Sequence, residues 1–194
     1  MKKLALTDFT KYRYPSALEL SPDGRYLTFA LKEVDREGDG YRWNLWLYDL
    51  ESRESRQITR GDDQRQAVWE DNTHILYKTT ELDEAMRARG FEEEWTVYHR
   101  LNVCTGEECE AFRLPMSVSG LWKMDEGRYV FTGETHLDRP NLLELTGEAL
   151  EKELVRRQQT KGYKVLTELP LCENGVGMFN QTRITLFLYC LLYT

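Results

Sequence analysis

The sequence predicts an all-β fold, a partial β-propeller of about three four-stranded blades, the last incomplete, with a helical insertion. A strand–turn–strand unit at residues 16–30 is followed by two further strands. Residues 69–77 align with residues 21–29 without a gap, 48 positions further along the chain. A third copy opens at Val118. One four-stranded sheet cannot bury both of its faces, so sheets repeated in this way stack around an axis. A β-sandwich with accidental similarity is the alternative, and the gapless second copy argues against it.

The first unit is the clearest of the three. The Pro-Asp-Gly sequence at residues 22–24 supplies its turn, because Pro fixes φ, Asp bonds back to the backbone and Gly accepts a positive φ. A polar loop is predicted at residues 33–40. Strand-forming residues follow at residues 43–48, and an outer strand is predicted at residues 55–59.

The second and third copies repeat this order of elements. Residues 95–103 repeat the third strand and residues 110–114 close the second unit. In the third copy, residues 127–130 (Gly-Arg-Tyr-Val) match residues 24–27 (Gly-Arg-Tyr-Leu). Residues 183–189 resemble the third strand of the first unit, so a further strand is predicted there.

Two segments interrupt the repeat. Within the second copy, Thr80 is predicted to cap a short helix that ends at Gly90. A longer insertion at residues 134–170 contains a predicted helix over residues 148–161, for which Gly162 is the expected stop. Both segments are therefore expected to be helical additions to a β framework.

The end of the chain breaks the pattern of the earlier copies. Its last five residues, Cys-Leu-Leu-Tyr-Thr, resemble a translated transposon-end sequencing adapter, and a native apolar strand end is the alternative. The predicted domains are an N-terminal extension at residues 1–15, the partial propeller at residues 16–189, and a non-native tail at residues 190–194. The blade repeats lie at about residues 16–60, 61–115 and 116–189, with the helical insertion at about residues 134–170.

Composition excludes several classes of function. The 194 residues carry a formal net charge of -7, which argues against a nucleic-acid or anionic-membrane partner. No apolar run approaches the roughly 20 residues that span a bilayer, and no targeting segment is visible, so a cytoplasmic location is expected. Cys104 and Cys109 could form a disulfide in an oxidising compartment, but in the cytosol free thiols are favoured. The three His residues stand alone, so neither a metal site nor a cofactor is expected.

Two segments carry a family resemblance. Residues 21–29, followed by Asn-Leu-Trp-Leu-Tyr-Asp at residues 44–49, resemble the propeller repeat of TolB-type proteins and of prolyl-oligopeptidase-family serine peptidases. Residues 166–177, placed after the helical insertion, resemble the acylaminoacyl-peptidase and dipeptidyl-peptidase branch of that family. In that branch aromatic residues often follow the Leu-Pro pair, whereas Leu171 and Cys172 stand here. The resemblance covers about residues 7 to 189.

The resemblance implies a function for a longer protein. In such enzymes the propeller precedes an α/β-hydrolase domain whose Ser lies in Gly-x-Ser-x-Gly. This chain contains no such motif, so no catalytic residue is assigned. We expect a non-catalytic propeller fragment, inactive alone, of a serine peptidase that hydrolyses short peptides, with the propeller gating access to a missing C-terminal hydrolase domain in cis. The alternatives are a TolB-like non-enzymatic propeller that binds a protein partner and a free-standing regulatory propeller.

The candidate substrate-binding residues are three consecutive acidic residues, Glu92, Glu93 and Glu94. Dipeptidyl-type relatives use a propeller Glu pair to hold the free amine of a substrate, a charge-assisted contact. The cluster does not match that motif residue by residue, and a solvated loop is the favoured interpretation. An inter-blade core position is favoured for most of the tryptophans, which are Trp43, Trp46, Trp69, Trp95 and Trp122.

An open ring of blades has a further consequence. At least two blade faces would lack a neighbour, and the strand at residues 184–189 would form an unpaired edge. Exposed apolar sheet surfaces and free edges favour association. We therefore expect the isolated chain to be oligomeric, aggregated or partly molten.

Overall fold

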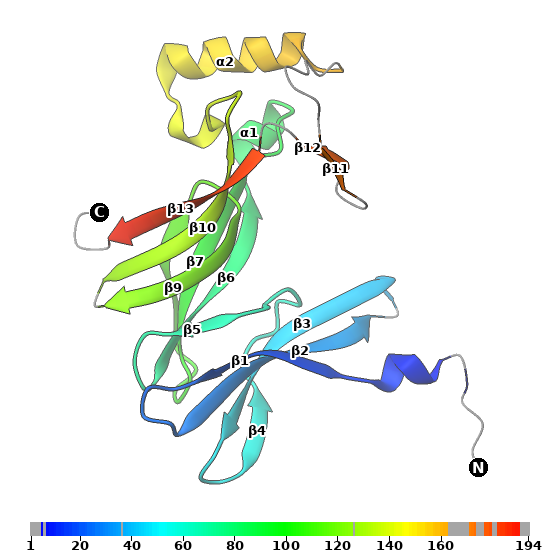
Figure 1. The fold of residues 1–194 in the computed structure, drawn as a ribbon, viewed down its shortest axis with the longest axis vertical. Coiled ribbons are helices and arrows are strands. Elements are labelled where there is room, and N and C mark those ends of the chain that lie inside the picture. The colour runs from blue at the N-terminus through cyan, green and yellow to red at the C-terminus, as the bar shows by residue number, and fades with distance from the viewer. Residues whose placement is uncertain are drawn as a thin grey trace. The chain divides into compact units, whose positions relative to one another are not determined.

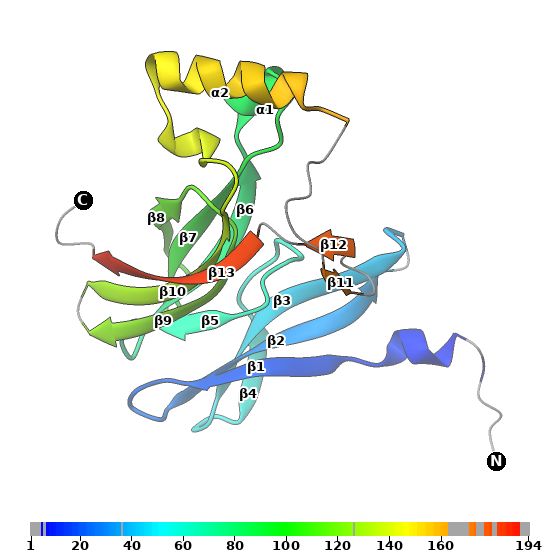
Figure 2. The same cartoon turned by 45° about the horizontal axis from the view of Figure 1, so that its top comes forward.

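The computed structural model describes residues 5, 7–35, 37–125, 127–162, 171–173, 177–179 and 182–190 (Figures 1 and 2). Strands dominate these residues, and they form three antiparallel sheets of three or four strands and a two-stranded hairpin. This architecture confirms the predicted all-β, partial-propeller fold. The chain divides into two compact units, Met1–Thr79 with Val97–Arg113 and Thr80–Thr96 with Leu114–Thr194.

The first unit begins with a four-stranded sheet in the order β1-β2-β3-β4. Its first turn is built as predicted, because Gly24 adopts φ +73°. The Asp23 carboxylate accepts hydrogen bonds from Ser21 Oγ (2.6 Å) and from the Arg25 backbone N–H (3.1 Å). A 3-10 helix, η1 (Asp8–Lys11), precedes the sheet, whose strands are β1 (Tyr14–Leu20), β2 (Tyr26–Asp35), β3 (Gly40–Asp49) and β4 (Glu54–Gln57).

The polar loop predicted at residues 33–40 is shorter in the structure: residues 33–35 belong to β2, Gly40 begins β3, and residues 37–39 form the turn between them. Strands β2 and β3 stay paired to the pairs Val34–Tyr41 and Asp35–Gly40. The Lys32 ammonium lies 3.7 Å from the centre of the Tyr41 ring. The polar residue types predicted a loop. In the structure, however, the backbone groups form hydrogen bonds between the two strands, and the Lys32 ammonium covers the Tyr41 ring.

The second sheet has the order β5-β6-β7-β8. The Asp71 carboxylate forms its first turn by accepting hydrogen bonds from the backbone N–H groups of Thr73 (2.7 Å) and His74 (2.8 Å). Asp71 and Asp23 therefore have the same role in successive copies, as turn formers. The strands are β5 (Ala67–Trp69), β6 (His74–Leu82), β7 (Glu94–Asn102) and β8 (Glu108–Leu114).

The first unit has one apolar core that both sheets share. Trp69 is buried in it, and its indole N–H donates to the Glu19 carbonyl (3.2 Å). The other four tryptophans are not buried to this extent, because an indole is rarely covered completely and Trp122 lies on an exposed sheet face. The buried members of the core are Ala30, Leu45 and Leu47 from the first sheet, Ala67, Trp69, Ile75, Tyr77 and Leu101 from the second, and Val103 just after β7.

Both described α-helices belong to the second unit. The cap of its first helix differs from the prediction, because Thr80 lies in β6 and the Asp83 carboxylate accepts the capping bond from Met86 N–H (2.9 Å). Gly90 and Gly162, the predicted stops, follow the helix ends with φ +84° and φ +104°. The helices are α1 (Glu84–Ala88), the 3-10 helix η2 (Leu142–Glu144) and α2 (Gly147–Gln159).

The third sheet also belongs to the second unit and has the order β13-β10-β9 (Figure 1). The predicted final strand is confirmed as β13, and the helical segment follows β10, which continues to His136. Residues 163–170, which hold the first part of the family motif, and tail residues 191–194 lie outside the described residues. The strands are β9 (Val118–Asp125), β10 (Arg128–His136) and β13 (Thr182–Cys190), and β11 (Leu171–Glu173) pairs with β12 (Gly177–Phe179).

Candidate functional site

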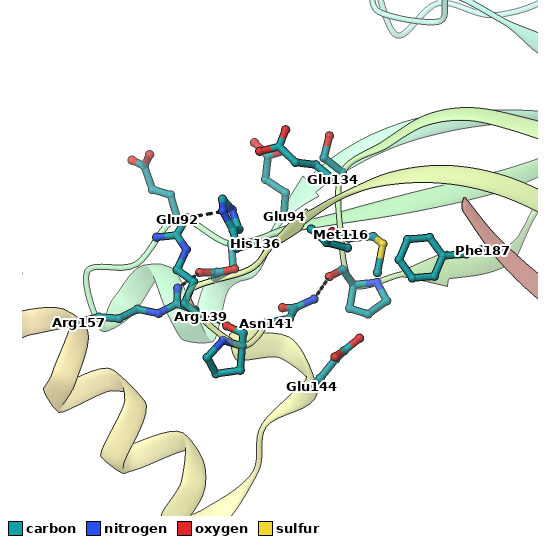
Figure 3. Close-up of a pocket in the computed structure, with 15 residues that line it drawn as sticks. Glu92, Glu94, Met116, Glu134, His136, Arg139, Asn141, Glu144, Arg157 and Phe187 are labelled. Atoms are coloured by element: carbon teal, nitrogen blue, oxygen red, sulfur yellow. Dashed lines mark hydrogen bonds and ion pairs between the residues drawn. The ribbon is translucent and has the colours of Figure 1, made fainter. Parts of the chain in front are cut away.

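A pocket of about 590 Å³ lies in the second unit (Figure 3). It is surrounded by the segment before β7, the link between β8 and β9, the end of β10, the loop after β10, η2 and α2. Its walls are strongly charged. The acidic lining residues are Glu92, Glu93, Glu94, Glu134 and Glu144, the basic ones are Arg139 and Arg157, and the apolar ones include Pro115, Met116, Pro140 and Phe187.

A small apolar cluster holds the helical wall of the pocket. Met86 of α1, Leu142 of η2 and Leu154 of α2 are buried together. Asn141 then fixes the entry into η2, because its side-chain oxygen accepts a hydrogen bond from Leu143 N–H (3.0 Å) and its amide donates to the Pro115 carbonyl. This arrangement ties the helical segment to the link between β8 and β9.

Strands form the other wall of the pocket, and the buried residue Thr96 of β7 holds them through two hydrogen bonds. Its hydroxyl donates to the Met116 carbonyl (2.7 Å) and accepts from Val118 N–H (3.2 Å). Close by in the chain, the Trp95 indole N–H donates to the Asp83 carboxylate (2.9 Å), and this bond lowers the pKa of Asp83. On the other side of the cluster the Phe91 N–H donates to the Met86 carbonyl (3.0 Å). Hydrogen bonds on both sides of Glu92–Glu94 thus give the acidic cluster a defined position.

Arg157 of α2 joins three segments of the pocket wall. Its guanidinium contacts the Glu93 carboxylate (2.8 Å), the Glu153 carboxylate (3.0 Å) and the Pro140 carbonyl (2.5 Å). Only 11% of the Arg157 side chain is exposed, so these charged hydrogen bonds are largely shielded from water. The hydrogen bonds from Arg156, aided by Arg157, lower the pKa of Glu153 from 4.5 to about 2. Glu93 therefore has a structural partner.

The remaining acidic groups of the pocket are exposed and lack a basic partner among the described residues. Glu92, Glu94, Glu134 and Glu144 are exposed, and in Figure 3 the side chains of Glu94 and Glu134 point in the same direction. Within the part of the chain that the structure describes, none of these four carboxylates forms an ion pair. They leave the pocket with negative charge that the protein itself does not neutralise.

The basic groups of the pocket offset this charge only in part, because Arg139 keeps its positive charge and His136 adds none. The Arg139 guanidinium donates to His136 Nε2 (2.9 Å), so the imidazole is the acceptor in its neutral form. Burial, followed by the positive charge of Arg139, lowers the pKa of His136 below its usual 6.5. The imidazole is therefore uncharged near neutral pH and adds no cation to the pocket.

The structure brings the three predicted acidic residues to one pocket and separates their roles. The sequence reasoning missed Glu134, Glu144, His136 and Arg139, because they lie about 40 or more positions away and share no spacing with the acidic cluster. Only the fold brings them together.

Among the described residues, no group of three or more His, Cys, Asp or Glu side chains is placed to hold a metal ion. No helix described here is long and apolar enough to cross a membrane.

No protein-family model matches the sequence, and no curated protein matches it. The fold, however, is similar to that of solved peptidases. A Pyrococcus horikoshii acylaminoacyl peptidase in an orthorhombic crystal form gives a TM-score of 0.63 at 13% identity, over 95% of this chain and 24% of that one. An acylaminoacyl peptidase in complex with Z-Gly-Gly-Phe-chloromethyl ketone gives 0.62 at 12% identity, with the same two coverages.

A third structure extends the comparison. The AtxE2 isopeptidase without ligand gives a TM-score of 0.50 at 14% identity, over 91% of this chain and 27% of that one. The chain therefore spans about a quarter of the length of the peptidases it resembles. At this identity the likeness concerns the fold. This chain is a partial β-propeller, similar to one quarter of an acylaminoacyl peptidase.

Proposed function

We propose that this chain is the propeller part of a cytoplasmic serine peptidase that hydrolyses short peptides. The observation that supports the proposal is the fold similarity to acylaminoacyl peptidase, which extends over 95% of the chain. In this arrangement the nucleophile, the base and the oxyanion hole belong to an α/β-hydrolase domain in the same polypeptide. The propeller restricts access, so that only small or unstructured peptides reach the active site.

The charged pocket has a place in this function. We propose that it binds a cationic group of a peptide, such as a free amino terminus. Glu92, Glu94, Glu134 and Glu144 are exposed carboxylates without ion pairs, and opposite charges at short range attract strongly in a partly enclosed site. Glu93 is excluded from this role because Arg157 already holds it.

The reading frame of the source locus tests the first proposal. Beyond codon 189 it should encode further blades and then a hydrolase domain containing Gly-x-Ser-x-Gly. A frame that ends after the propeller would overturn the peptidase proposal and favour the TolB-like binding module. The 194-residue chain alone should not cleave acyl-amino-acid or dipeptide chromogenic substrates above background. Turnover that a serine-directed phosphonate abolishes would show a nucleophile within this chain.

Calorimetric titration tests the pocket separately. We expect a dipeptide with a free amino terminus to bind about tenfold more tightly than its N-acetylated form, since a charge-assisted hydrogen bond contributes about 1.5–3 kcal/mol. Glu94→Gln and Glu134→Gln should each reduce this preference. Glu148→Gln is the matched control, because Glu148 is exposed on α2 and does not line the pocket. Equal binding of the two dipeptides would contradict the amine site and leave the propeller assignment untouched.

A further inference from the structure

Arg139 is an exposed cation in a pocket whose walls are mainly acidic. It lies in the loop between β10 and η2, and its guanidinium contacts the His136 ring (Figure 3). Within the part of the chain that the structure describes, Arg139 forms no ion pair, although four carboxylates of the same pocket also lack one. Opposite charges are therefore present in one cavity without neutralising each other.

His136 holds these charges apart. Its Nε2 accepts a hydrogen bond from Arg139 (2.9 Å), which fixes the guanidinium beside the imidazole. Glu134 precedes His136 by two residues on β10, so both side chains lie on the same face of the strand, about 6–7 Å apart along it. In Figure 3 the His136 ring lies between the Arg139 guanidinium and the side chains of Glu94 and Glu134. The pocket thus has a cationic part and an anionic part.

The cationic part can hold a carboxylate. A guanidinium has five N–H donors, and the hydrogen bond to His136 uses one of those on Arg139. The remaining donors are enough to contact both oxygens of a carboxylate in the bidentate geometry that arginine favours. Arg157, the other arginine of the pocket, does not offer its charge in this way, because it is already bound to Glu93 and Glu153.

The anionic part can hold an ammonium group. Glu94 begins β7 and Glu134 lies on β10, and their side chains point in the same direction (Figure 3). An ammonium has three N–H donors and no acceptor, so two carboxylates match it in charge and in hydrogen bonding. Met116 and Phe187 add apolar wall for the rest of a ligand. The volume of about 590 Å³ is within the range of about 300–1,000 Å³ that is usual for small-ligand sites.

We propose that the pocket takes a whole short peptide with both termini free, with Arg139 binding its carboxylate and Glu94 and Glu134 binding its amino group. The inference rests on the amine site proposed above and extends it from one terminus to both. A ligand with opposite charges at its two ends matches a pocket in which opposite charges are held apart. A peptide that is acylated or amidated loses one of the two contacts, and an internal segment of a longer chain loses both. The site therefore selects free short peptides over protein chains.

Calorimetric titration with four forms of the dipeptide Ala-Leu tests this selection. The forms are the free dipeptide, its N-acetyl derivative, its carboxyl-terminal amide and the doubly blocked derivative. The free dipeptide should bind about tenfold more tightly than its amide, because the amide forms no charge-assisted contact with the guanidinium. The doubly blocked derivative should bind most weakly.

Variants of Arg139 assign the carboxylate contact. Arg139→Gln should bind the free dipeptide and its amide equally, while its preference for the free dipeptide over the N-acetyl derivative should remain. Arg139→Lys should restore part of the lost preference, because it keeps the charge without the bidentate geometry. Arg60→Gln is the matched control and should behave as the wild type, because Arg60 is exposed and does not line the pocket. Circular dichroism checks that each variant is folded.

The carboxylate site and the amine site fail in different ways. A wild-type chain that prefers the free amino terminus but binds the free dipeptide and its amide equally would overturn the carboxylate site and leave the amine site standing. Equal binding of all four forms would overturn both. A folded Arg139→Gln variant that keeps the preference for a free carboxylate, or an Arg60→Gln variant that loses it, would also overturn the assignment to Arg139.

Discussion

The core that the first two sheets share and one face of the third sheet are made of the same kinds of residues, yet the core is buried and this face is open to solvent. We call it the outer face, and its exposed apolar residues are Trp122, Met124, Ile184, Leu186 and Leu188. Leu45 and Ile75 are fully buried between sheets, while Leu186 and Leu188 are about two-thirds exposed. Along β13 exposed and shielded side chains alternate in the pattern of a half-buried sheet, whereas β6 buries Ile75, Leu76 and Tyr77 in succession. The difference shows that alternation decides which side chains share a face, and that a neighbouring sheet decides whether that face is buried.

The largest expected effect separates the two regions directly. Leu45→Ala should lower the free energy of unfolding by about 2–5 kcal/mol, because it leaves a cavity in a closed core. Leu188→Ala should change it by less than about 0.5 kcal/mol, because that side chain is already in water. Urea denaturation, at a protein concentration below any association, gives both values. Equal losses would show that the outer face is covered within the monomer.

The second prediction concerns how the second unit is held together where its apolar cluster is small. Arg157→Met should lower the free energy of unfolding by about 1.5–3 kcal/mol, because it leaves Glu93 without a charged partner and the Pro140 carbonyl without a donor. Arg89→Met is the control, since its ion pair with Glu151 is exposed and should be worth less than about 1 kcal/mol. Urea denaturation measures the loss of stability in each variant. Equal losses in the two variants would contradict the prediction.

The third prediction uses the low pKa of Glu153, which is about 2 in the folded chain against 4.5 ordinarily. A carboxyl whose folded pKa is depressed binds fewer protons when folded, so its contribution to stability is complete above about pH 4.5. That contribution is lost as the pH falls through about 2. The melting temperature measured from pH 5 to pH 2 should fall less steeply for Glu153→Gln than for the wild type. An unchanged slope would show that Arg156 and Arg157 do not hold this carboxylate.

The smallest effect is spectroscopic. Trp69 is buried in the shared core and Trp122 is half exposed on the outer face. Trp122→Phe should remove the largest part of the fluorescence that iodide quenches, while Trp69→Phe should remove an unquenched part. Trp43, Trp46 and Trp95 are partly exposed and should leave some quenching in both variants. Equal quenching of the two variants would contradict the prediction.

Most of the fold could be predicted from the sequence because the repeat is local. The Pro-Asp-Gly turn at residues 22–24 and the Asp71 turn form hydrogen bonds within a few residues, so residue types alone identify them. Prediction was wrong where a distant partner decides the outcome. Residues 33–35 are strand because they pair with β3. Thr80 does not cap α1 because it belongs to β6, and Asp83, whose carboxylate also accepts from the Trp95 indole, is the cap. Although Gly24 and Gly127 take nearly the same φ, β10 begins one residue after its glycine and β2 begins two residues after.

The candidate site was predictable only in part. Its acidic cluster is visible as three consecutive Glu residues, but the pocket itself exists only when the end of β10 and the helical segment are brought to that cluster. The sequence by itself determined most of the strands, the turns at residues 22–24 and 71–74, and which side chains of a strand share a face, because these depend on neighbours along the chain. The tertiary structure alone decided that Arg157 occupies Glu93 while Glu92 and Glu94 stay open, and that the outer face is exposed. These outcomes depend on contacts between residues far apart in sequence, and no local pattern encodes such contacts.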